Sequence, residues 1–241
     1  MSGADHEHYD HYRADMIERL DRGYGHVDRW INARIAALLP PGARVLDVGC
    51  GFGSLGAELE QLGIRAVGVD LLPFCLRAGR ARTPRAKLVC ATAEALPFPA
   101  GAFDVAVFKD VWHHLADEAP LEPIFAELER VGVRELVISD PNPNPLLLLG
   151  RRAIGHVDPV CGPQDARALL ARHGFEVVDE RYGVVTGLAL SGGYVGPELA
   201  PASRRLWRAL TRLDGAVSGA VERLGLGRQV CWRYFLRARR R

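Results

Sequence analysis

The sequence predicts an α/β protein built on a doubly wound sheet of seven strands, mostly parallel, with an antiparallel last strand. Three observations lead to this prediction. Short apolar strands alternate with helical segments through most of the 241 residues, which is the pattern of a parallel sheet covered by helices on both faces. The strand at 44–48 runs into three glycines at alternating positions. The next strand, at 65–70, ends in a carboxylate, Asp70.

The elements follow in order along the chain. A helical leader over residues 1–40 ends at Pro40-Pro41-Gly42. We expect one domain over residues 1–241, with a ligand-binding core at 43–182 and the last strand within 229–238. Strands are predicted at 44–48, 65–70, 86–91, 103–108, 134–139, 175–182 and 230–237, and helices at 54–62, 73–81, 118–131 and 164–173.

Two stretches, 140–160 and 183–228, interrupt this alternation. The first contains four leucines, 146–149, which we expect to lie in the core or to form an apolar wall. The second contains a glycine-rich loop, 191–194, and an amphipathic helix over 203–224. Both stretches follow strands whose C-terminal ends border the ligand crevice of an open α/β sheet. They are therefore predicted to form a lid over the substrate. The apolar residues on one face of the helix are Leu206, Leu210, Leu213, Val217, Val221 and Leu224.

The composition narrows the classes of partner and compartment. The formal net charge of +2 favours neither nucleic acid nor membrane as a partner. All apolar runs are shorter than the ~18 residues that span a membrane, and the polar N-terminus does not resemble a signal peptide. The five cysteines are widely spaced, which is typical of reduced, buried thiols in the cytoplasm. The exposed face of the helix over 203–224 offers a surface for a homodimer.

The most informative motif is the glycine loop Asp47-Val48-Gly49-Cys50-Gly51-Phe52-Gly53. Glycine lets the backbone turn sharply and lets a ligand approach it closely. The N–H groups of the helix that begins at Ser54 point at the same place. Asp70 follows at the position that holds ribose hydroxyls in nucleotide-binding α/β folds.

A dinucleotide cofactor is the competing interpretation, because residues 51–56 also match G-x-G-x-x-G. A carboxylate directly before the glycines favours another ligand. Asp47 would attract a positively charged amino-acid group and would repel a pyrophosphate.

With these residues the chain resembles the class I S-adenosylmethionine-dependent methyltransferases, which have a Rossmann-like fold. The stretches 91–104 and 105–115 are similar to small-molecule methyltransferases of the ubiquinone-biosynthesis type. Thr92 stands where that family has an Asp that accepts a hydrogen bond from the adenine amino group, and a hydroxyl can also accept it. The resemblance implies S-adenosylmethionine as cofactor, bound by Tyr12, Asp47, Gly49, Cys50, Gly51, Gly53, Asp70, Leu71, Thr92, Ala93, Glu94, Lys109 and His114.

His113, His114 and Asp110 are the candidate catalytic residues. They follow the fourth strand, at the mouth of the crevice, and an imidazole has a pKa suited to proton transfer at neutral pH. Asp140 is an alternative base, although a turn or capping role suits it as well. No metal site is predicted, because the cluster His6-Glu7-His8 lacks partner ligands at a fixed spacing.

These features together predict an enzyme that methylates a small molecule, most simply at oxygen, in specialised metabolism. The large insertions favour a bulky, partly apolar substrate over a protein or RNA. The alternatives are a cyclase-like catalyst that binds S-adenosylmethionine without transferring its methyl group, a nicotinamide oxidoreductase, and a binding module without chemistry.

Overall fold

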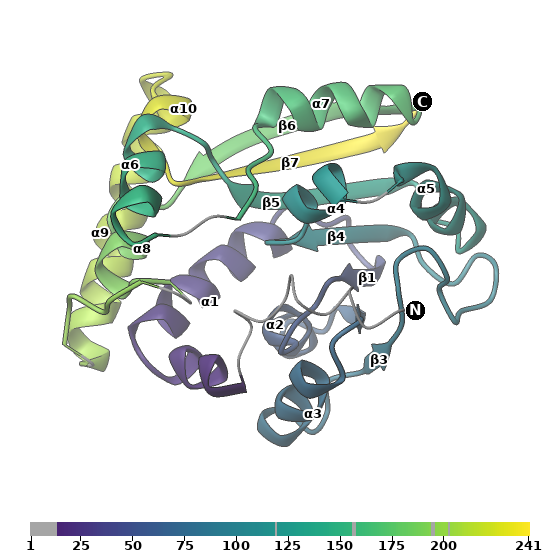
Figure 1. Cartoon of the computed structure of the whole chain (residues 1–241), viewed down its shortest axis with the longest axis horizontal. Coiled ribbons are helices and arrows are strands. Elements are labelled where there is room, and N and C mark those ends of the chain that lie inside the picture. The colour runs from purple at the N-terminus through teal and green to yellow at the C-terminus, as the bar shows by residue number, and fades with distance from the viewer. Residues whose placement is uncertain (1–13, 119, 156–157, 194–195, 202) are drawn as a thin grey trace.

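A single seven-stranded sheet organises the chain, with strand order β3-β2-β1-β4-β5-β7-β6 (Figure 1). The computed structural model describes residues 14–118, 120–155, 158–193, 196–201 and 203–241. β1 to β5 run parallel to one another, and β7 runs antiparallel to both β5 and β6. The predicted fold class is confirmed. The strands are β1 Arg44–Val48, β2 Arg65–Asp70, β3 Leu88–Cys90, β4 Val105–Lys109, β5 Glu135–Pro141, β6 Phe175–Gly183 and β7 Arg233–Arg240.

Helices cover both faces of the sheet and bury two apolar cores (Figure 1). One core packs α4, α5 and α7 against the sheet, and the other packs η2, α1, α2, α3 and α9. No helix in the described part of the chain is long and apolar enough to cross a membrane. The helices are η2 Ala14–Asp21, α1 Gly23–Ala36, α2 Ser54–Gln61, α3 Pro73–Arg82, α4 Trp112–Glu118, α5 Leu121–Arg130, α6 Pro145–Ala153, α7 Pro163–Arg172, α8 Gly187–Ser191, α9 Arg204–Arg223 and α10 Gly227–Val230.

The helix expected over 118–131 is present as α5, and an additional helix, α4, precedes it. α5 begins after Pro120, its N-cap residue, because proline suits the start of a helix better than its interior. The earlier helix, α4, starts at Trp112, whose ring packs edge-on against Phe108 and Phe125. This extra helix carries His113 and His114 at its beginning.

The leucine run 146–149 forms part of a helix, α6, in the first insertion. Asn144 caps it by accepting a hydrogen bond from the Leu147 amide at 2.8 Å. Only Leu147 of the four is buried, so the run as a whole does not lie in the core; Leu147 instead lines a cavity, as the alternative of an apolar wall expects. A helix presents one face to its support, which leaves the other three leucines toward solvent.

The amphipathic helix of the second insertion is present as α9, but its apolar stripe is only partly covered. Leu213 is 57% exposed and Leu224 is 73% exposed. The face that packs on the protein instead buries Trp207, Asp214 and Ser218. The Asp214 carboxylate accepts hydrogen bonds from the backbone amides of residues 185–187, which anchors α9 to the loop after β6.

The cysteines depart from the expectation of buried thiols at two positions, one of which is the half-buried Cys50. Cys75, Cys161 and Cys231 are buried free thiols, whereas Cys90 at the end of β3 is exposed. β3 is the edge strand of the sheet, and this explains the exposure.

Candidate functional site

The glycine loop follows β1 and turns through left-handed backbone conformations. The φ angles of Gly49, Gly51 and Gly53 are 69°, 51° and 72°, a region that side chains disfavour. A Cβ at Gly49 would lie 2.5 Å from a methyl carbon of Val111, whereas a Cβ at Gly51 would point into open space. The loop therefore needs glycine, and at Gly51 it leaves room for a ligand against the backbone.

Asp70 organises this loop from the end of β2. Its Oδ2 accepts a hydrogen bond from the Gly51 amide at 2.7 Å, and its Oδ1 accepts one from the Leu72 amide at 2.8 Å. A carboxylate has about four acceptor sites, so Asp70 can hold the loop and still accept hydrogen bonds from a ligand.

Lys109, at the end of β4, lies in a buried polar network. Its ammonium group donates to Asp28, to Asn32 Oδ1 at 2.7 Å and to Ser54 Oγ at 3.2 Å. Asp28 and Asn32 belong to α1 and are themselves buried. The network fixes the leader helix against the glycine loop. The sequence did not predict a role for either α1 residue. A single Asp or Asn on a helix does not indicate a contact with a lysine that lies 81 or 77 residues further along the chain.

Asp47 is the buried acid of the glycine motif. Its side chain is enclosed, and burial raises its pKa to about 7 although the positive charge of Lys109 opposes this shift. Together with Gly49, Cys50, Gly51 and residues 109–110 it lines a small cavity of about 30 Å³.

The other predicted cofactor residues lie along the adjoining strand ends. Leu71, Thr92 and Ala93 are half-buried where β2 and β3 finish, and Glu94 is exposed. The Ala91 amide donates to the Asp70 carbonyl at 3.1 Å, which joins the two strand ends. Tyr12 and the cluster His6-Glu7-His8 lie outside the described residues.

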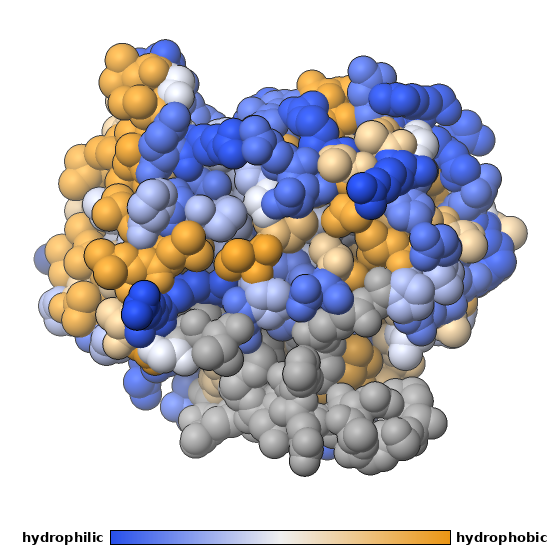
Figure 2. Space-filling view, turned by 45° about the horizontal axis from the view of Figure 1, so that its top comes forward, coloured by the Kyte–Doolittle hydropathy of each residue, from blue (hydrophilic) through white to orange (hydrophobic). Residues whose placement is uncertain are grey.

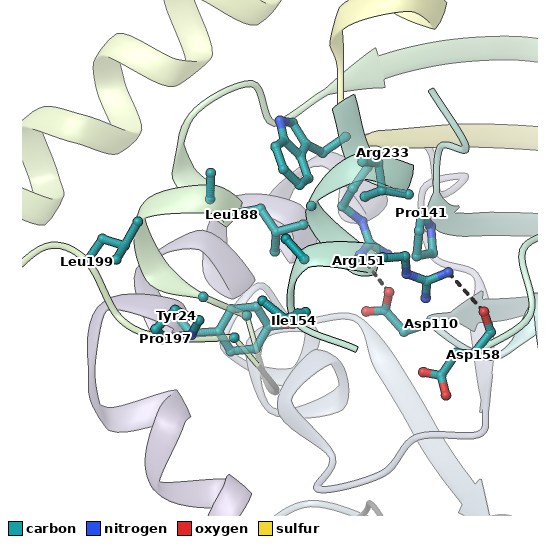
Figure 3. Close-up of a pocket in the computed structure, with 18 of the residues that line it drawn as sticks. Tyr24, Asp110, Pro141, Arg151, Ile154, Asp158, Leu188, Pro197, Leu199 and Arg233 are labelled. Atoms are coloured by element: carbon teal, nitrogen blue, oxygen red, sulfur yellow. Dashed lines mark hydrogen bonds and ion pairs between the residues drawn. The ribbon is translucent and has the colours of Figure 1, made fainter. Parts of the chain in front are cut away.

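A second and much larger cavity has a volume of about 370 Å³, and Figure 3 draws residues that line it. Both cavities include Asp110 in their lining. The polar end of the larger cavity contains Asp110, His113, His114, Arg151 and Arg233. Most of the remaining lining is apolar and comes from the two insertions, including Leu147, Ile154, Leu188, Pro197 and Leu199, and Trp232 adds to it from the start of the last predicted strand.

His113 is held firmly at the polar end. Its backbone amide and its Nδ1 both lie against Asp140 Oδ2, at 3.0 and 2.9 Å. Burial alone would lower the pKa of His113, but the charge and hydrogen bond of Asp140 outweigh burial and raise it above the ordinary value of 6.5. Because the carboxylate can only accept, Nδ1 carries the proton and Nε2 is left as the basic nitrogen.

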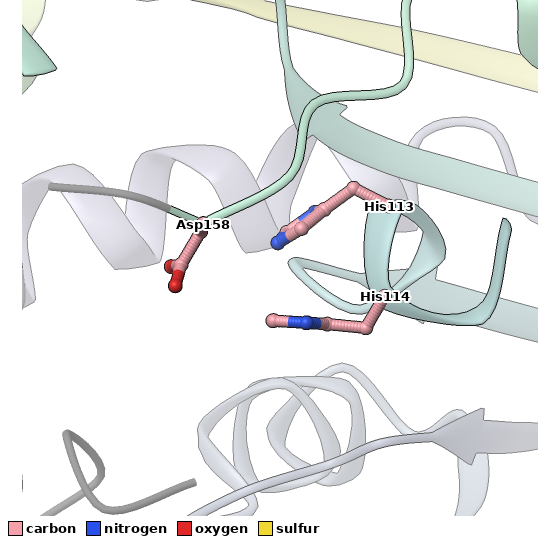
Figure 4. A group of neighbouring side chains, drawn as sticks. All are labelled: His113, His114 and Asp158. Carbon is pink, nitrogen blue, oxygen red and sulfur yellow. The ribbon is translucent and has the colours of Figure 1, made fainter. Parts of the chain in front are cut away.

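His113, His114 and Asp158 converge at one place in this cavity (Figure 4). Their ligand atoms all lie within 4.8 Å of one another. The two imidazole rings are 4.3 Å apart between centroids. One hydroxyl group or one cation placed there can contact all three side chains.

Asp110 joins the two cavities and has an unusual backbone. Its φ of 56° is in the left-handed region, which a non-glycine residue adopts at a cost of about 1–3 kcal/mol. The buried guanidinium of Arg233 on β7 compensates for this, since it donates to Asp110 at 2.6 Å and to the Ser139 carbonyl at 2.8 Å. The sequence offered no sign of this role for Arg233.

Comparison with known proteins agrees with this arrangement. Residues 46–135 match the family described as a methyltransferase domain. The chain is 31% identical to 2-methyl-6-phytyl-1,4-hydroquinone methyltransferase of Synechocystis sp., over 73% of this chain and 57% of that protein. It is 30% identical to a ubiquinone biosynthesis O-methyltransferase of Xanthomonas axonopodis pv. citri, over 46% of this chain and 48% of that protein. The chain spans about half the length of the curated relatives it matches.

Solved structures share the fold over most of the chain. A SAM-dependent methyltransferase from Archaeoglobus fulgidus superimposes with a TM-score of 0.62 and 18% identity, covering 89% of this chain and 93% of that one. The cyclase SpnF gives a TM-score of 0.57 and 22% identity, covering 88% and 80%. At these identities the likeness is one of fold.

Proposed function

We propose that this chain, as a member of the class I S-adenosylmethionine-dependent methyltransferases, methylates a hydroxyl oxygen of a small, bulky and partly apolar metabolite in specialised metabolism. One observation carries the proposal. The large apolar cavity and the glycine-loop cavity share Asp110, and His113, which is held by Asp140, lines the large cavity.

The residues of the glycine loop fit S-adenosylmethionine. The open space over Gly51 admits a ligand against the backbone, and Asp70 retains acceptor capacity for ribose hydroxyls. The buried Asp47 suits the cationic amino group. Because the enclosed volume is only about 30 Å³, we expect the adenosine part to lie over the half-buried strand ends at Leu71, Thr92 and Ala93. When bound, the cofactor supplies an electrophilic methyl carbon whose bond to sulfur breaks as the bond to the acceptor oxygen forms.

His113 is assigned as the general base. An acceptor hydroxyl must lose its proton when its oxygen is methylated, and Nε2 of His113 is the nitrogen left to take it. Asp140 is a positioning residue, because it holds the ring orientation and stabilises the imidazolium. Asp110 is engaged by Arg233, so we assign it to shaping the junction, and His114 to contacting the acceptor beside His113.

The shape of the cavity supports the acceptor class. Its polar groups gather at the end next to the glycine loop, and its remaining wall is apolar (Figure 3). A ligand with a hydroxylated ring and an apolar body would place the hydroxyl at His113 and bury the rest against the insertions. Transfer of labelled methyl to a panel of phenols with and without alkyl tails tests this: products favouring tailed phenols support it, and no product with any acceptor contradicts it.

The second candidate function is a cyclase-like catalyst that binds S-adenosylmethionine without consuming it. The likeness of fold to the cyclase SpnF and the apolar cavity favour it. The polar junction with a positioned base favours methyl transfer. Appearance of S-adenosylhomocysteine together with a methylated product would exclude the cyclase alternative.

A further inference from the structure

The exposed apolar side chains of this protein are concentrated on one part of its surface. Among the described residues, ten of the twelve exposed large hydrophobic side chains lie in the two insertions, and only Leu62 and Val178 lie elsewhere. Scattered apolar residues are normal on a surface, whereas a concentration marks a contact. We call this concentration the leucine-rich face, represented by Leu146, Leu149, Leu199, Leu206, Leu213 and Leu224.

Arginines accompany these leucines. In the described residues of the two insertions, every charged side chain that is exposed is an arginine. Leu206 and Leu213 are seven residues apart on α9, so they share one flank, and Arg205 and Arg212 share the neighbouring flank for the same reason. Figure 2 shows apolar side chains gathered at the end of the molecule formed by α6, α9 and α10, with hydrophilic ones among them. This is the composition of a basic amphipathic surface.

The acidic groups of the same segments do not offset this charge. Asp214 is buried against the backbone amides after β6, and Glu222 pairs with Arg34. Glu198 accepts a hydrogen bond from the Gly23 amide. The exposed charge of the face is therefore positive. Two copies of the chain that met through this face would bring like charges together, which costs free energy, whereas an anionic surface would be attracted.

The leucine-rich face also borders the large cavity. Ile154 is 46% exposed and Leu199 is 67% exposed, and both line the cavity. Gly150 and Arg151 of α6 line it as well, next to the exposed leucines of that helix. An acceptor held in an apolar phase against this face would meet an apolar path to His113.

We propose that the leucine-rich face docks on a membrane surface rich in anionic phospholipid and that the cavity takes its acceptor from that surface. The leucines enter the boundary between headgroups and acyl chains, and the arginines pair with lipid phosphates. The formal net charge of +2 for the whole chain does not indicate a basic surface. The basic surface arises because of the side of α6 and α9 that faces outward. The docking is independent of the proposed function. The delivery of the acceptor from the membrane rests on the proposed function.

Flotation of the whole chain with lipid vesicles tests the docking. We expect the protein to float with vesicles of phosphatidylcholine and phosphatidylglycerol, at least about tenfold more than with phosphatidylcholine alone, and we expect added salt to reduce this binding. The double variants Leu149→Asp/Leu213→Asp and Arg205→Glu/Arg212→Glu should each lose it. The matched controls Leu62→Asp and Arg77→Glu change exposed residues elsewhere and should keep it.

Calorimetric binding of S-adenosylmethionine to every variant shows that each one is folded. Equal flotation with both kinds of vesicle, or none with either, would overturn the proposal. So would a salt-stable dimer that Leu149→Asp/Leu213→Asp dissociates, because the face would then be a contact between copies. If the wild type floats as expected but transfers no methyl group, the proposed function fails and the docking stands.

Discussion

Asp140 holds His113 through a single carboxylate oxygen, which lies 3.0 Å from the His113 backbone nitrogen and 2.9 Å from its Nδ1. Both residues are buried, so the contact is shielded from competing water. The backbone bond fixes the start of α4 and the ring bond fixes the tautomer. One acid thus sets both the place and the basicity of the proposed base.

Asp140→Asn should therefore lower kcat by about 100-fold and change its pH dependence. The base works unprotonated, so kcat/KM falls as the pH drops through the pKa of His113, which lies above 6.5 in the wild type. The variant loses the charge that raises this pKa, and the acidic limb should move to lower pH. Initial rates from pH 5 to 9 measure both effects. If the acidic limb of the pH profile is at the same pH in Asp140→Asn and in the wild type, a group other than His113 is responsible for it.

Asp70→Ala should weaken S-adenosylmethionine binding by at least about 100-fold. The variant loses the proposed acceptor for the ribose and also the anchor of the Gly51 amide. Calorimetry measures the dissociation constant. Asp117→Ala, an exposed acid on α4, is the control and should bind as the wild type does. Unchanged affinity in Asp70→Ala would remove the glycine loop from the cofactor site.

Asp47→Asn should make stability less dependent on pH. The pKa of Asp47 is raised from 3.8 to about 7 in the folded protein, chiefly by burial. Well below pH 3.8 the acid is protonated in both states. As the pH rises toward 7 it ionises in the unfolded chain first, so the wild type loses stability relative to the variant, by as much as about 4 kcal/mol. The difference should level off above pH 7.

Urea unfolding of both proteins from pH 2 to 8 checks this prediction, because the range includes the ordinary carboxyl pKa of 3.8 and both folded-state values. Asp104→Asn provides the opposite sign, because its hydrogen bonds with Arg44 lower the pKa of Asp104 to about 2. The stability that Asp104 contributes is present above its unfolded pKa and is lost as the pH falls toward 2. A constant difference between Asp47→Asn and the wild type at every pH would contradict the assignment for Asp47.

Lys109→Met should cost about 3–5 kcal/mol of stability, because it leaves the buried carboxylate of Asp28 without its cation. Adding Asp28→Asn should restore part of the loss, since the remaining amide carries no charge. Equilibrium unfolding in urea measures all three proteins. If the double variant is no more stable than the single one, the ion pair is not the source of the loss.

Local pattern was sufficient to predict the sheet and the cofactor motif. The strands at 44–48 and 65–70 coincide with β1 and β2, because a buried strand between a turn and a glycine loop has a signature that spans few residues. Gly51 and Asp70, 19 residues apart in the sequence, are in hydrogen-bond contact. The parallel pairing of β1 with β2 brings them together.

Contacts between residues far apart in the chain, and the direction in which each helix faces, could not be predicted from the sequence. Arg233 reaches Asp110 across 123 residues through the antiparallel pairing of β7 with β5, and no local pattern encodes that register. The sequence leaves Asp140 as either a base or a turn residue, and its contact with His113 is what supports the proposal that it positions that ring. The stripe on α9 was visible in the sequence, but its exposure depends on what packs against it.

The most direct test of the proposed mechanism compares His113→Gln with the wild type in two measurements. With labelled S-adenosylmethionine and a phenol that the wild type accepts, in buffer containing EDTA, we expect the wild type to transfer methyl and the variant to be slower by about 100-fold or more. The dissociation constant for S-adenosylmethionine should be the same for both proteins. Undiminished transfer by His113→Gln would contradict the assignment of the base, and loss of wild-type transfer on chelation would mean that a cation at His113, His114 and Asp158 takes its place.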